Sequence, residues 1–246
     1  MNKFSLLLLL VGSLMFACDK DDNTPTDKTD DVVEIAIRQV KTGQLAAFEQ
    51  ARTNFINLLK QQDGVSNDRE YASFFHFNPA QDTSRQVYIG MTQYEDLATF
   101  QKVGADIGTS AEAGAFFSTF DALVFTAMKP KVAGTEVDLS KVAQSGQILE
   151  VAVRNLSLYP NFIQADYEAK LDAFLAVLAQ QTGRVAEYQW ISVLDPNIVV
   201  GMTVYESQQA FFNIALNPDF ANHPDVVAFF TAYPPNMGGE VSTVVK

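Results

Sequence analysis

Glutamate and arginine side chains recur at matching positions in two parts of this chain, where together they could orient a small molecule. Glu34 and Arg38 lie four residues apart in VEIAIR, and Glu150 and Arg154 repeat that spacing in LEVAVR. In an alternating strand, such positions share one face, so both groups would point into the same space. A few polar groups in an apolar wall are typical of a ligand pocket.

Two further predicted strands in each part add polar and aromatic side chains to these faces. The apolar faces, with Val33, Ile35 and Ile37 in the first strand, suit contact with helices, and the mixed faces should then meet between two sheets. The candidate pocket residues are Glu34, Arg38, Tyr71, Gly90, Thr92, Tyr94, Glu150, Arg154, Tyr188, Trp190, Gly201, Thr203 and Tyr205. A filled interface, in which the Glu and Arg groups pair with each other, is the alternative.

The two histidines point less clearly to chemistry. His76 is expected on the helix side of a strand, in a structural or exposed role. His223 precedes Pro224, and this pair predicts the start of a helix. The sequence contains no glycine-rich phosphate loop, no Ser-His-Asp order and no zinc-binding spacing, so no metal and no catalytic residue is assigned.

An internal repeat explains why the candidates come in pairs. VEIAIR matches LEVAVR, FINLLKQQDG matches FLAVLAQQTG, GMTQYE matches GMTVYE, and AFFSTF matches AFFTAY, all in the same order. The glycine inside each GMT strand, Gly90 and Gly201, weakens a strand and often marks the close approach of another group. That group could be a ligand or an aromatic side chain of the opposite sheet.

Alternation, helical spacing and turn residues predict the same elements in each copy. Strands are expected at 32–41, 69–78, 85–94 and 121–129, with helices at 44–62, 96–104 and 111–120. Gly64 should adopt a left-handed conformation beyond the first helix. The second copy repeats this at 147–158, 162–181, 185–194, 198–205, 207–231 and 239–245. The order β-α-β-β-α-β is that of a ferredoxin-like unit, and two such open sheets can cover each other.

The chain therefore resembles the dimeric α/β-barrel superfamily, and within it the antibiotic-biosynthesis-monooxygenase-like domains in tandem. The resemblance covers residues 32–130 and 147–246 and depends on element order, doubling and strand patterns. It implies an α+β fold of two ferredoxin-like units that form an intramolecular barrel. The expected organisation is a first repeat at 32–130, a linker at 131–146 and a second repeat at 147–246, in a monomer with an internal pseudo-twofold.

The resemblance implies two classes of function. We expect a protein that binds a small apolar or aromatic ligand between the sheets; the alternative is a cofactor-free monooxygenase-like enzyme for a small aromatic or quinol-type substrate. Heme-degrading members of the superfamily use an Asn, a Trp and a His. Asn155, Trp190 and His223 match that set imperfectly, so no cofactor is expected.

Composition limits the partners. The chain has 246 residues, 48% of them hydrophobic, and a formal net charge of −12. Nucleic-acid binding requires basic patches, so this balance argues against it.

The N-terminal residues predict that the protein is located in the cell envelope. Residues 1–17 are expected to form a signal peptide; they contain five consecutive leucines and are followed by Cys18, the single cysteine. LMFAC resembles a bacterial lipobox, which implies lipidation of Cys18 and outer-membrane anchoring; a plain secretory peptide is the alternative. Residues 18–31 would form a flexible acidic tether. Lys20-Asp21-Asp22 resembles the export signal of surface lipoproteins in Bacteroidetes-type bacteria, or is simply a soluble linker.

Overall fold

The computed structural model describes residues 30–77, 82–136 and 138–245. The predicted signal peptide, Cys18 and most of the tether lie outside these described residues. Within the described ranges, the helices are too short or too polar to span a membrane.

The elements follow the predicted order in both halves. The first half contains β1 (Val32–Val40), α2 (Leu45–Leu59), β2 (Val65–His76), β3 (Val87–Tyr94), α3 (Leu97–Ile107), α4 (Ala111–Phe117) and β4 (Phe120–Pro130). The second half contains β5 (Ile148–Asn155), α5 (Gln164–Leu178), β6 (Arg184–Ser192), β7 (Ile198–Tyr205), α6 (Gln208–Ala215), α7 (Pro218–Ala221), α8 (Pro224–Ala232) and β8 (Gly238–Val244). Two 3-10 turns, η2 (Leu139–Lys141) and η3 (Leu156–Leu158), complete the set.

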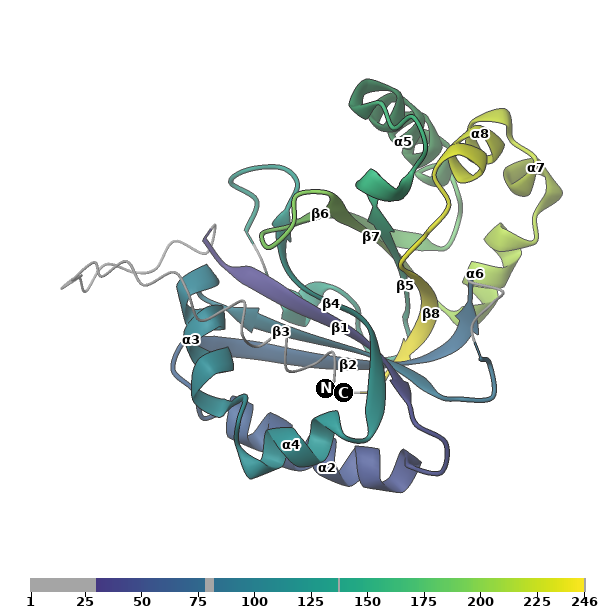
Figure 1. Cartoon of the computed structure of the whole chain (residues 1–246). Coiled ribbons are helices and arrows are strands. Elements are labelled where there is room, and N and C mark those ends of the chain that lie inside the picture. Colours follow the sequence, from purple (N-terminus) through teal and green to yellow (C-terminus); the bar gives the residue numbers. More distant parts are fainter. Residues whose placement is uncertain (1–29, 78–81, 137, 246) are drawn as a thin grey trace.

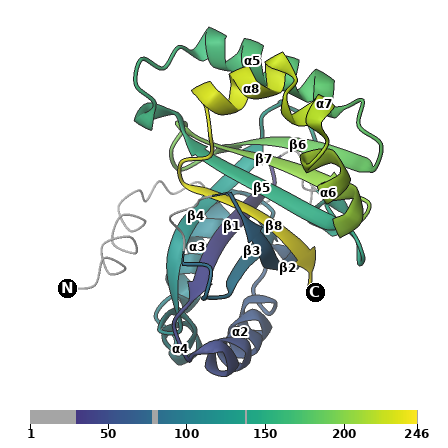
Figure 2. The same cartoon turned by 90° about the vertical axis from the view of Figure 1, so that its right-hand side faces the viewer.

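The strands form one closed barrel in the order β1-β3-β2-β8-β5-β7-β6-β4. Strands β1 to β4 belong to the first half and β5 to β8 to the second, so the halves join at two seams, β2–β8 and β4–β6. Helices α2, α3 and α4 cover the outside of the first sheet, and α5 to α8 cover the second (Figure 1; Figure 2). The predicted α+β fold class, two ferredoxin-like units in an intramolecular barrel, is confirmed.

Local signals in the sequence set where the helices begin. Asp96, Ser110 and Ser207 accept hydrogen bonds from backbone N–H groups three residues later, as N-cap residues do. His223 caps α8 ahead of Pro224, which confirms the predicted helix start. The single helix expected at 207–231 is instead three helices, because Pro218 and Pro224 each begin a new one.

The assignment of the strand faces from sequence was wrong for β1, β3, β5 and β7. The apolar side chains of β1, β3, β5 and β7 pack together in one cluster between the sheets, with members from both halves, such as Ile35, Met91, Val151 and Met202. The lumen is therefore filled by apolar side chains. Most of the candidate residues face the helices instead: Glu34, Arg38, Gly90, Thr92, Tyr94, Glu150, Arg154, Gly201, Thr203 and Tyr205.

The apolar faces lie between the sheets because the lumen is closed to solvent. A space closed by two sheets offers neither water nor helix side chains to polar groups, and unpaired buried polar groups are costly. The purely apolar face therefore belongs inside the barrel. The space between each sheet and its helices, in contrast, is lined by amphipathic helices and borders solvent. Glu and Arg side chains can therefore be accommodated there.

Candidate functional site

A cavity of about 210 Å³ lies between the first sheet and its three covering helices. Its floor consists of strand residues from β1, β2 and β3, and its walls are largely aromatic. The side chains that matter below are Glu34, Ala36, Arg38, Glu70, Gly90, Thr92, Tyr94, Phe55, Phe100, Phe116, Phe117, Phe120 and Phe125. By volume, the space suits a molecule of one or two rings, since an engineered apolar cavity of about 150 Å³ takes up benzene.

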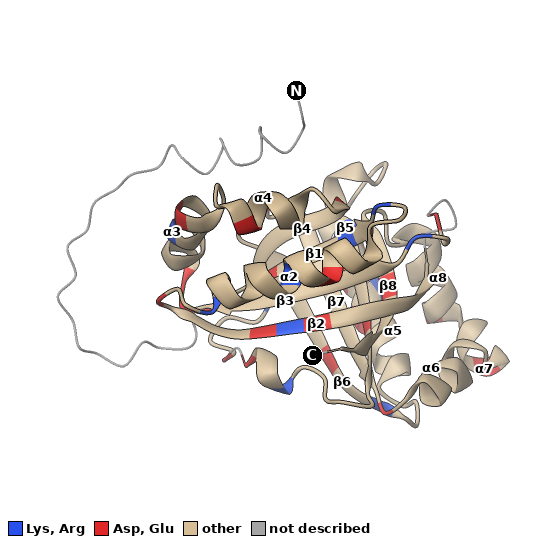
Figure 3. Cartoon of the chain, turned by 90° about the horizontal axis from the view of Figure 1, so that it is seen from below, with Lys and Arg blue, Asp and Glu red and all other residues tan. Residues whose placement is uncertain are grey.

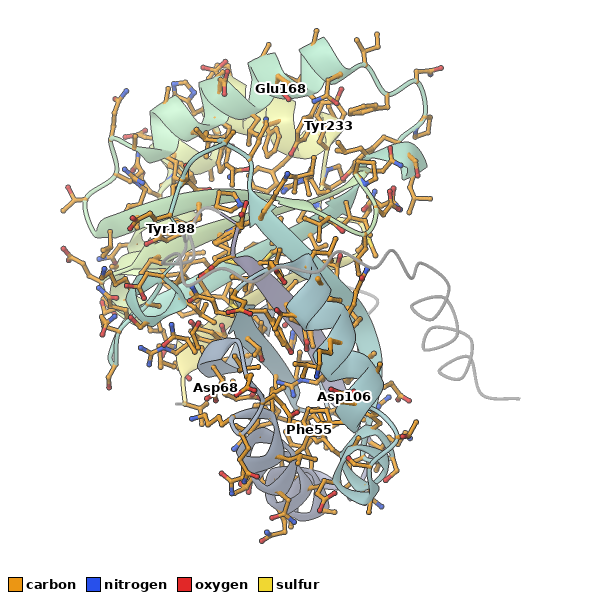
Figure 4. The ribbon with its side chains drawn as sticks, turned by 90° about the vertical axis from the view of Figure 1, so that its left-hand side faces the viewer. Phe55, Asp68, Asp106, Glu168, Tyr188 and Tyr233 are labelled. Carbon is orange, nitrogen blue, oxygen red and sulfur yellow. The ribbon has the colours of Figure 1, made fainter. Side chains whose placement is uncertain are left out.

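The cavity meets solvent along α3 and β4. Phe125 on β4 is 41% exposed, and Gly104 and Ala105 on α3 are exposed as well. A β-carbon added at Gly104 would meet no atom within 4 Å, so this glycine leaves open space at the rim. Phe55, labelled in Figure 4, lies on α2 below the first sheet and lines the cavity.

Glu34 and Tyr94 form a hydrogen-bonded polar pair in the cavity floor. The Tyr94 hydroxyl donates to Glu34 Oε2 at 3.0 Å. Burial raises the pKa of Glu34, while the Tyr94 hydrogen bond and the charge of Arg38 oppose that rise. Burial and the neighbouring Glu34 charge raise the pKa of Tyr94 well above its ordinary value. Glu34 remains partly exposed because it borders the cavity, so its carboxyl group can meet a bound molecule.

Arg38 reaches across one strand to pair with another. Arg38 Nη2 on β1 lies 2.8 Å from both Glu70 oxygens on β2, and β3 runs between these strands. The guanidinium passes over Gly90, where a β-carbon would lie 2.1 Å from Nη2. Glu70 belongs to a charged stretch, Asp68 to Glu70, visible as the red and blue segment of β2 in Figure 3.

Aromatic rings hold the arginine in place. Its guanidinium carbon lies 5.2 Å from the ring centroid of Phe116 and 5.7 Å from that of Phe48. A second arginine, Arg52 on α2, places Nη1 3.5 Å from Glu70 Oε1. Arg38 Nε is buried and has no hydrogen-bond partner among the described residues. Glu70 thus sits between two cations, Arg38 and Arg52.

The second half keeps part of this arrangement and changes the rest. The Tyr205 hydroxyl donates to Glu150 at 2.5 Å, as Tyr94 does to Glu34. Arg154 instead donates from Nε to the carbonyl oxygen of Tyr233 at 2.7 Å, and its guanidinium lies over Phe229. Gln189 replaces Glu70 opposite the strand glycine, Gly201. The two halves therefore share a fold but not an ion pair.

Two half-buried carboxyl groups, Glu150 and Glu187, lie near each other in the second half. Thr203 donates to Glu187 at 2.6 Å, and Gln189 donates to it at 2.7 Å. Burial raises the pKa of Glu187 to about 7, and the charge of Glu150 adds to the rise. This position corresponds to Asp68 in the first half, since both face the Thr of the GMT strand.

The remaining candidates lie where they were expected, between the sheets. Tyr71 and Trp190 belong to the lumen cluster, and Tyr188 packs against it; Figure 4 shows Tyr188 on the second sheet. The Tyr71 hydroxyl and Trp190 Nε1 are buried without a partner among the described residues. Sequence analysis missed Glu70 and the helix phenylalanines as site residues. A charged run inside a predicted strand was the one signal for Glu70.

Comparison by sequence finds no matching family model and no matching curated protein. Comparison by structure finds clear likenesses. A monooxygenase candidate from Fusobacterium nucleatum superposes with a TM-score of 0.54 at 10% identity, covering 88% of this chain and 93% of that one. An anthrone oxidase-like protein gives 0.54 at 13% identity, covering 88% and 92%. A variant of chlorite dismutase from Candidatus Nitrospira defluvii gives 0.54 at 11% identity, covering 88% and 92%.

These likenesses show the class of fold. The chain is a dimeric α/β barrel, built here from two halves of one chain. At identities of 10–13% they show nothing further about its activity.

Three residues were considered for heme from the sequence: Asn155, Trp190 and His223. Asn155 caps η3, Trp190 lies in the lumen and His223 caps α8, so these three residues serve separate structural purposes. No histidine lines the 210 Å³ cavity, which is also smaller than the 300–1,000 Å³ usual for drug-sized ligands. The cavity does not fit heme. Among the described residues, no three His, Cys, Asp or Glu side chains are grouped to hold a metal ion.

Proposed function

We propose that this chain binds a small, largely apolar molecule of one or two rings in the helix-side cavity of its first half. The observation that carries the proposal is Glu34, a carboxyl group bordering an aromatic-lined space of about 210 Å³. A largely apolar wall with a few placed polar groups is the usual design of a small-molecule site. The site is on the opposite face of the sheet from the one expected, because the lumen is filled.

The ligand's polar group should be a hydroxyl. Glu34 accepts from Tyr94 through one oxygen and has a second oxygen available, so it can accept a hydrogen bond from a ligand. Phe100 and Phe125, whose ring centroids lie 6.3 Å apart, could both pack against one side of a ligand ring. A hydroxylated arene, such as 1-naphthol, meets both requirements.

Calorimetric titration with 1-naphthol and with naphthalene tests the proposal. We expect 1-naphthol to bind at one site and naphthalene to bind about three- to tenfold more weakly, for want of one hydrogen bond. The double variant Glu34→Met with Tyr94→Phe removes both polar partners and should abolish that preference. Absence of binding for both compounds would refute the site.

We propose further that the chain acts while anchored in the cell envelope through lipid on Cys18. The support is sequence alone: a leucine-rich start followed by a cysteine and an acidic segment. Cys18→Ala should release the protein from membranes. Continued membrane association of this variant would refute the anchor.

A second candidate function is cofactor-free oxygenation of the same kind of ligand. It is favoured by Glu34, whose raised pKa suits a group that takes a proton from a phenol, and by the fold shared with proteins described as an anthrone oxidase-like protein and a monooxygenase candidate. Glu34 would take the hydroxyl proton of 1-naphthol, and the ring would supply the electrons that reduce oxygen. One oxygen atom would form the new carbonyl of 1,4-naphthoquinone and the other would leave as water.

Oxygen uptake separates the two functions. An enzyme consumes one oxygen molecule for each 1-naphthol and forms naphthoquinone, and Glu34→Gln slows this sharply. A binding protein titrates with 1-naphthol in calorimetry but leaves the oxygen level unchanged.

A further inference from the structure

A second hollow, which we call the His76 cleft, opens at the end of the first half where β2 ends and β3 begins. It has a volume of about 540 Å³ and is lined by the turn after β1, by β2 and by the segment leading into β3. Among its described lining residues are Lys41, Thr42, Gly43, His76, Ser84 and Arg85. It shares no lining residue with the cavity of the proposed function, so it is a separate place.

His76 is held in this cleft by a buried carboxylate. Its Nδ1 lies 2.5 Å from Glu240 Oε2 on β8, and Glu240 is fully buried. Ser73 donates to the same oxygen at 2.5 Å. A buried carboxylate needs a charged or donating partner, and His76 supplies it across the β2–β8 seam. The ring is therefore fixed, and its Nε2 has no hydrogen-bond partner among the described residues.

The described lining of the cleft carries basic but no acidic side chains, in a protein that is strongly acidic overall. The chain carries a net charge of −12, yet the described lining contains Lys41, Arg85 and His76 and neither Asp nor Glu. Three acids lie close to it: Glu240 under His76, Asp121 paired with Arg85, and Asp82, whose carboxylate accepts from the hydroxyl of Ser84. Lys41 has no carboxylate partner in the described part of the chain; its Nζ donates to the carbonyl oxygen of Ser118 at 2.7 Å.

The side chain of Arg85 and the backbone of the turn after β1 add further donors to the cleft. Arg85 is held in place by donating to the carbonyl oxygens of Val40, at 2.9 Å, and Gln39, at 3.2 Å. Gly43 takes a left-handed conformation, with φ +74°, at the tip of the turn after β1. The backbone N–H groups of Thr42 and Gly43 donate to no described residue. Backbone amides in such turns bind anions.

We propose that the His76 cleft binds a small organic oxyanion, a carboxylate or a phosphate ester. Lys41 supplies the charge, the amides of Thr42 and Gly43 supply directed donors, and His76 Nε2 supplies a further polar contact. The buried Glu240 fixes the direction of the imidazole, as a positioning residue does. The volume accommodates a molecule larger than a bare phosphate ion.

Calorimetric titration of the full chain in mild detergent, with inorganic phosphate and separately with citrate, tests this proposal. We expect saturable binding of at least one of the two at one site, and a preference identifies the phosphate or the carboxylate class. Lys41→Gln should weaken binding about tenfold, the effect of losing one charge-assisted hydrogen bond. The control is Lys129→Gln on β4, exposed and outside the cleft, which should leave binding unchanged.

Two results would overturn the proposal: no heat with either anion, or equal weakening by Lys41→Gln and Lys129→Gln, which would indicate general charge attraction only. Lys41 is half-buried and its side chain makes one hydrogen bond to a described residue, the carbonyl oxygen of Ser118, so its variant should fold. The emission of Trp190, the single tryptophan, buried between the sheets, confirms folding of each variant.

Discussion

Arg38 on β1 forms an ion pair with Glu70 on β2 across the intervening strand, β3. Gly90 on β3 leaves room for the guanidinium group between them. Nη2 lies 2.8 Å from both carboxylate oxygens, and any β-carbon at position 90 would occupy the place of the guanidinium. Gly90, the glycine of the first GMT sequence, therefore makes room for an ion pair within the first half.

Gly90→Ala should unfold the protein more easily than Gly201→Ala. The alanine methyl at 90 displaces a buried, ion-paired guanidinium, so we expect a loss of about 3 kcal/mol in the free energy of unfolding. At 201 the added β-carbon would lie 3.2 Å from Gln189 Nε2, the end of a flexible neutral side chain, and the loss should be about 1 kcal/mol or less. Urea unfolding followed by Trp190 emission measures both. Equal losses would contradict the role of Gly90.

The partners of that ion pair should be coupled. Glu70→Leu alone leaves Arg38 buried beside Arg52 without its ion-pair partner, and should cost about 3–5 kcal/mol. Adding Arg38→Met removes the orphaned charge and should recover much of the loss. Unfolding of the single and double variants gives the coupling energy. A double variant less stable than Glu70→Leu would show that the pair is not the dominant interaction.

Stability should fall with rising pH because of Glu187. Its carboxyl has a pKa of about 7 when folded, against an ordinary value of 4.5, so the folded chain binds the extra proton between these values. The stabilising contribution is complete below pH 4.5 and is lost as pH rises through 7, by up to about 3 kcal/mol relative to Glu187→Gln. Unfolding of both proteins at pH 5 and pH 8 measures the difference. A constant gap between the two would contradict the burial of this carboxyl.

Gly104→Ala should stabilise the protein. Gly104 lies inside α3, and a β-carbon there meets no neighbour, so alanine gains helix propensity of about 0.5–1 kcal/mol without strain. Gly114→Ala in α4 should behave alike for the same reason. Thermal melting tests both. A lower melting temperature for Gly104→Ala would mean that the cavity rim is more tightly packed than described.

The sequence predicted the fold because duplication and alternation are properties of the chain itself. VEIAIR and LEVAVR became β1 and β5, and Gly64 has the expected positive φ, +77°. The side of each sheet could not be predicted in the same way. Alternation separates the faces of β1 but leaves open which one meets helices, since both layers bury apolar area.

The partner of Gly90 was equally hidden. The sequence indicates that something approaches this glycine, but Arg38 and Glu70 are 32 residues apart and meet only through the order β1-β3-β2. A strand order fixes which side chains can reach across a neighbour, and residue spacing does not carry that information.

One calorimetric comparison decides whether the cavity between the first sheet and its helices binds a ligand. Gly104 borders the cavity and Gly114 does not, yet both are exposed helix glycines with open space beside them. Titration of the parent chain, Gly104→Leu and Gly114→Leu with 1-naphthol should show binding to the parent and to Gly114→Leu, and binding weakened about tenfold or more in Gly104→Leu, whose side chain fills the rim. Equal binding by all three proteins, or none by the parent, would contradict a ligand site between the first sheet and its helices.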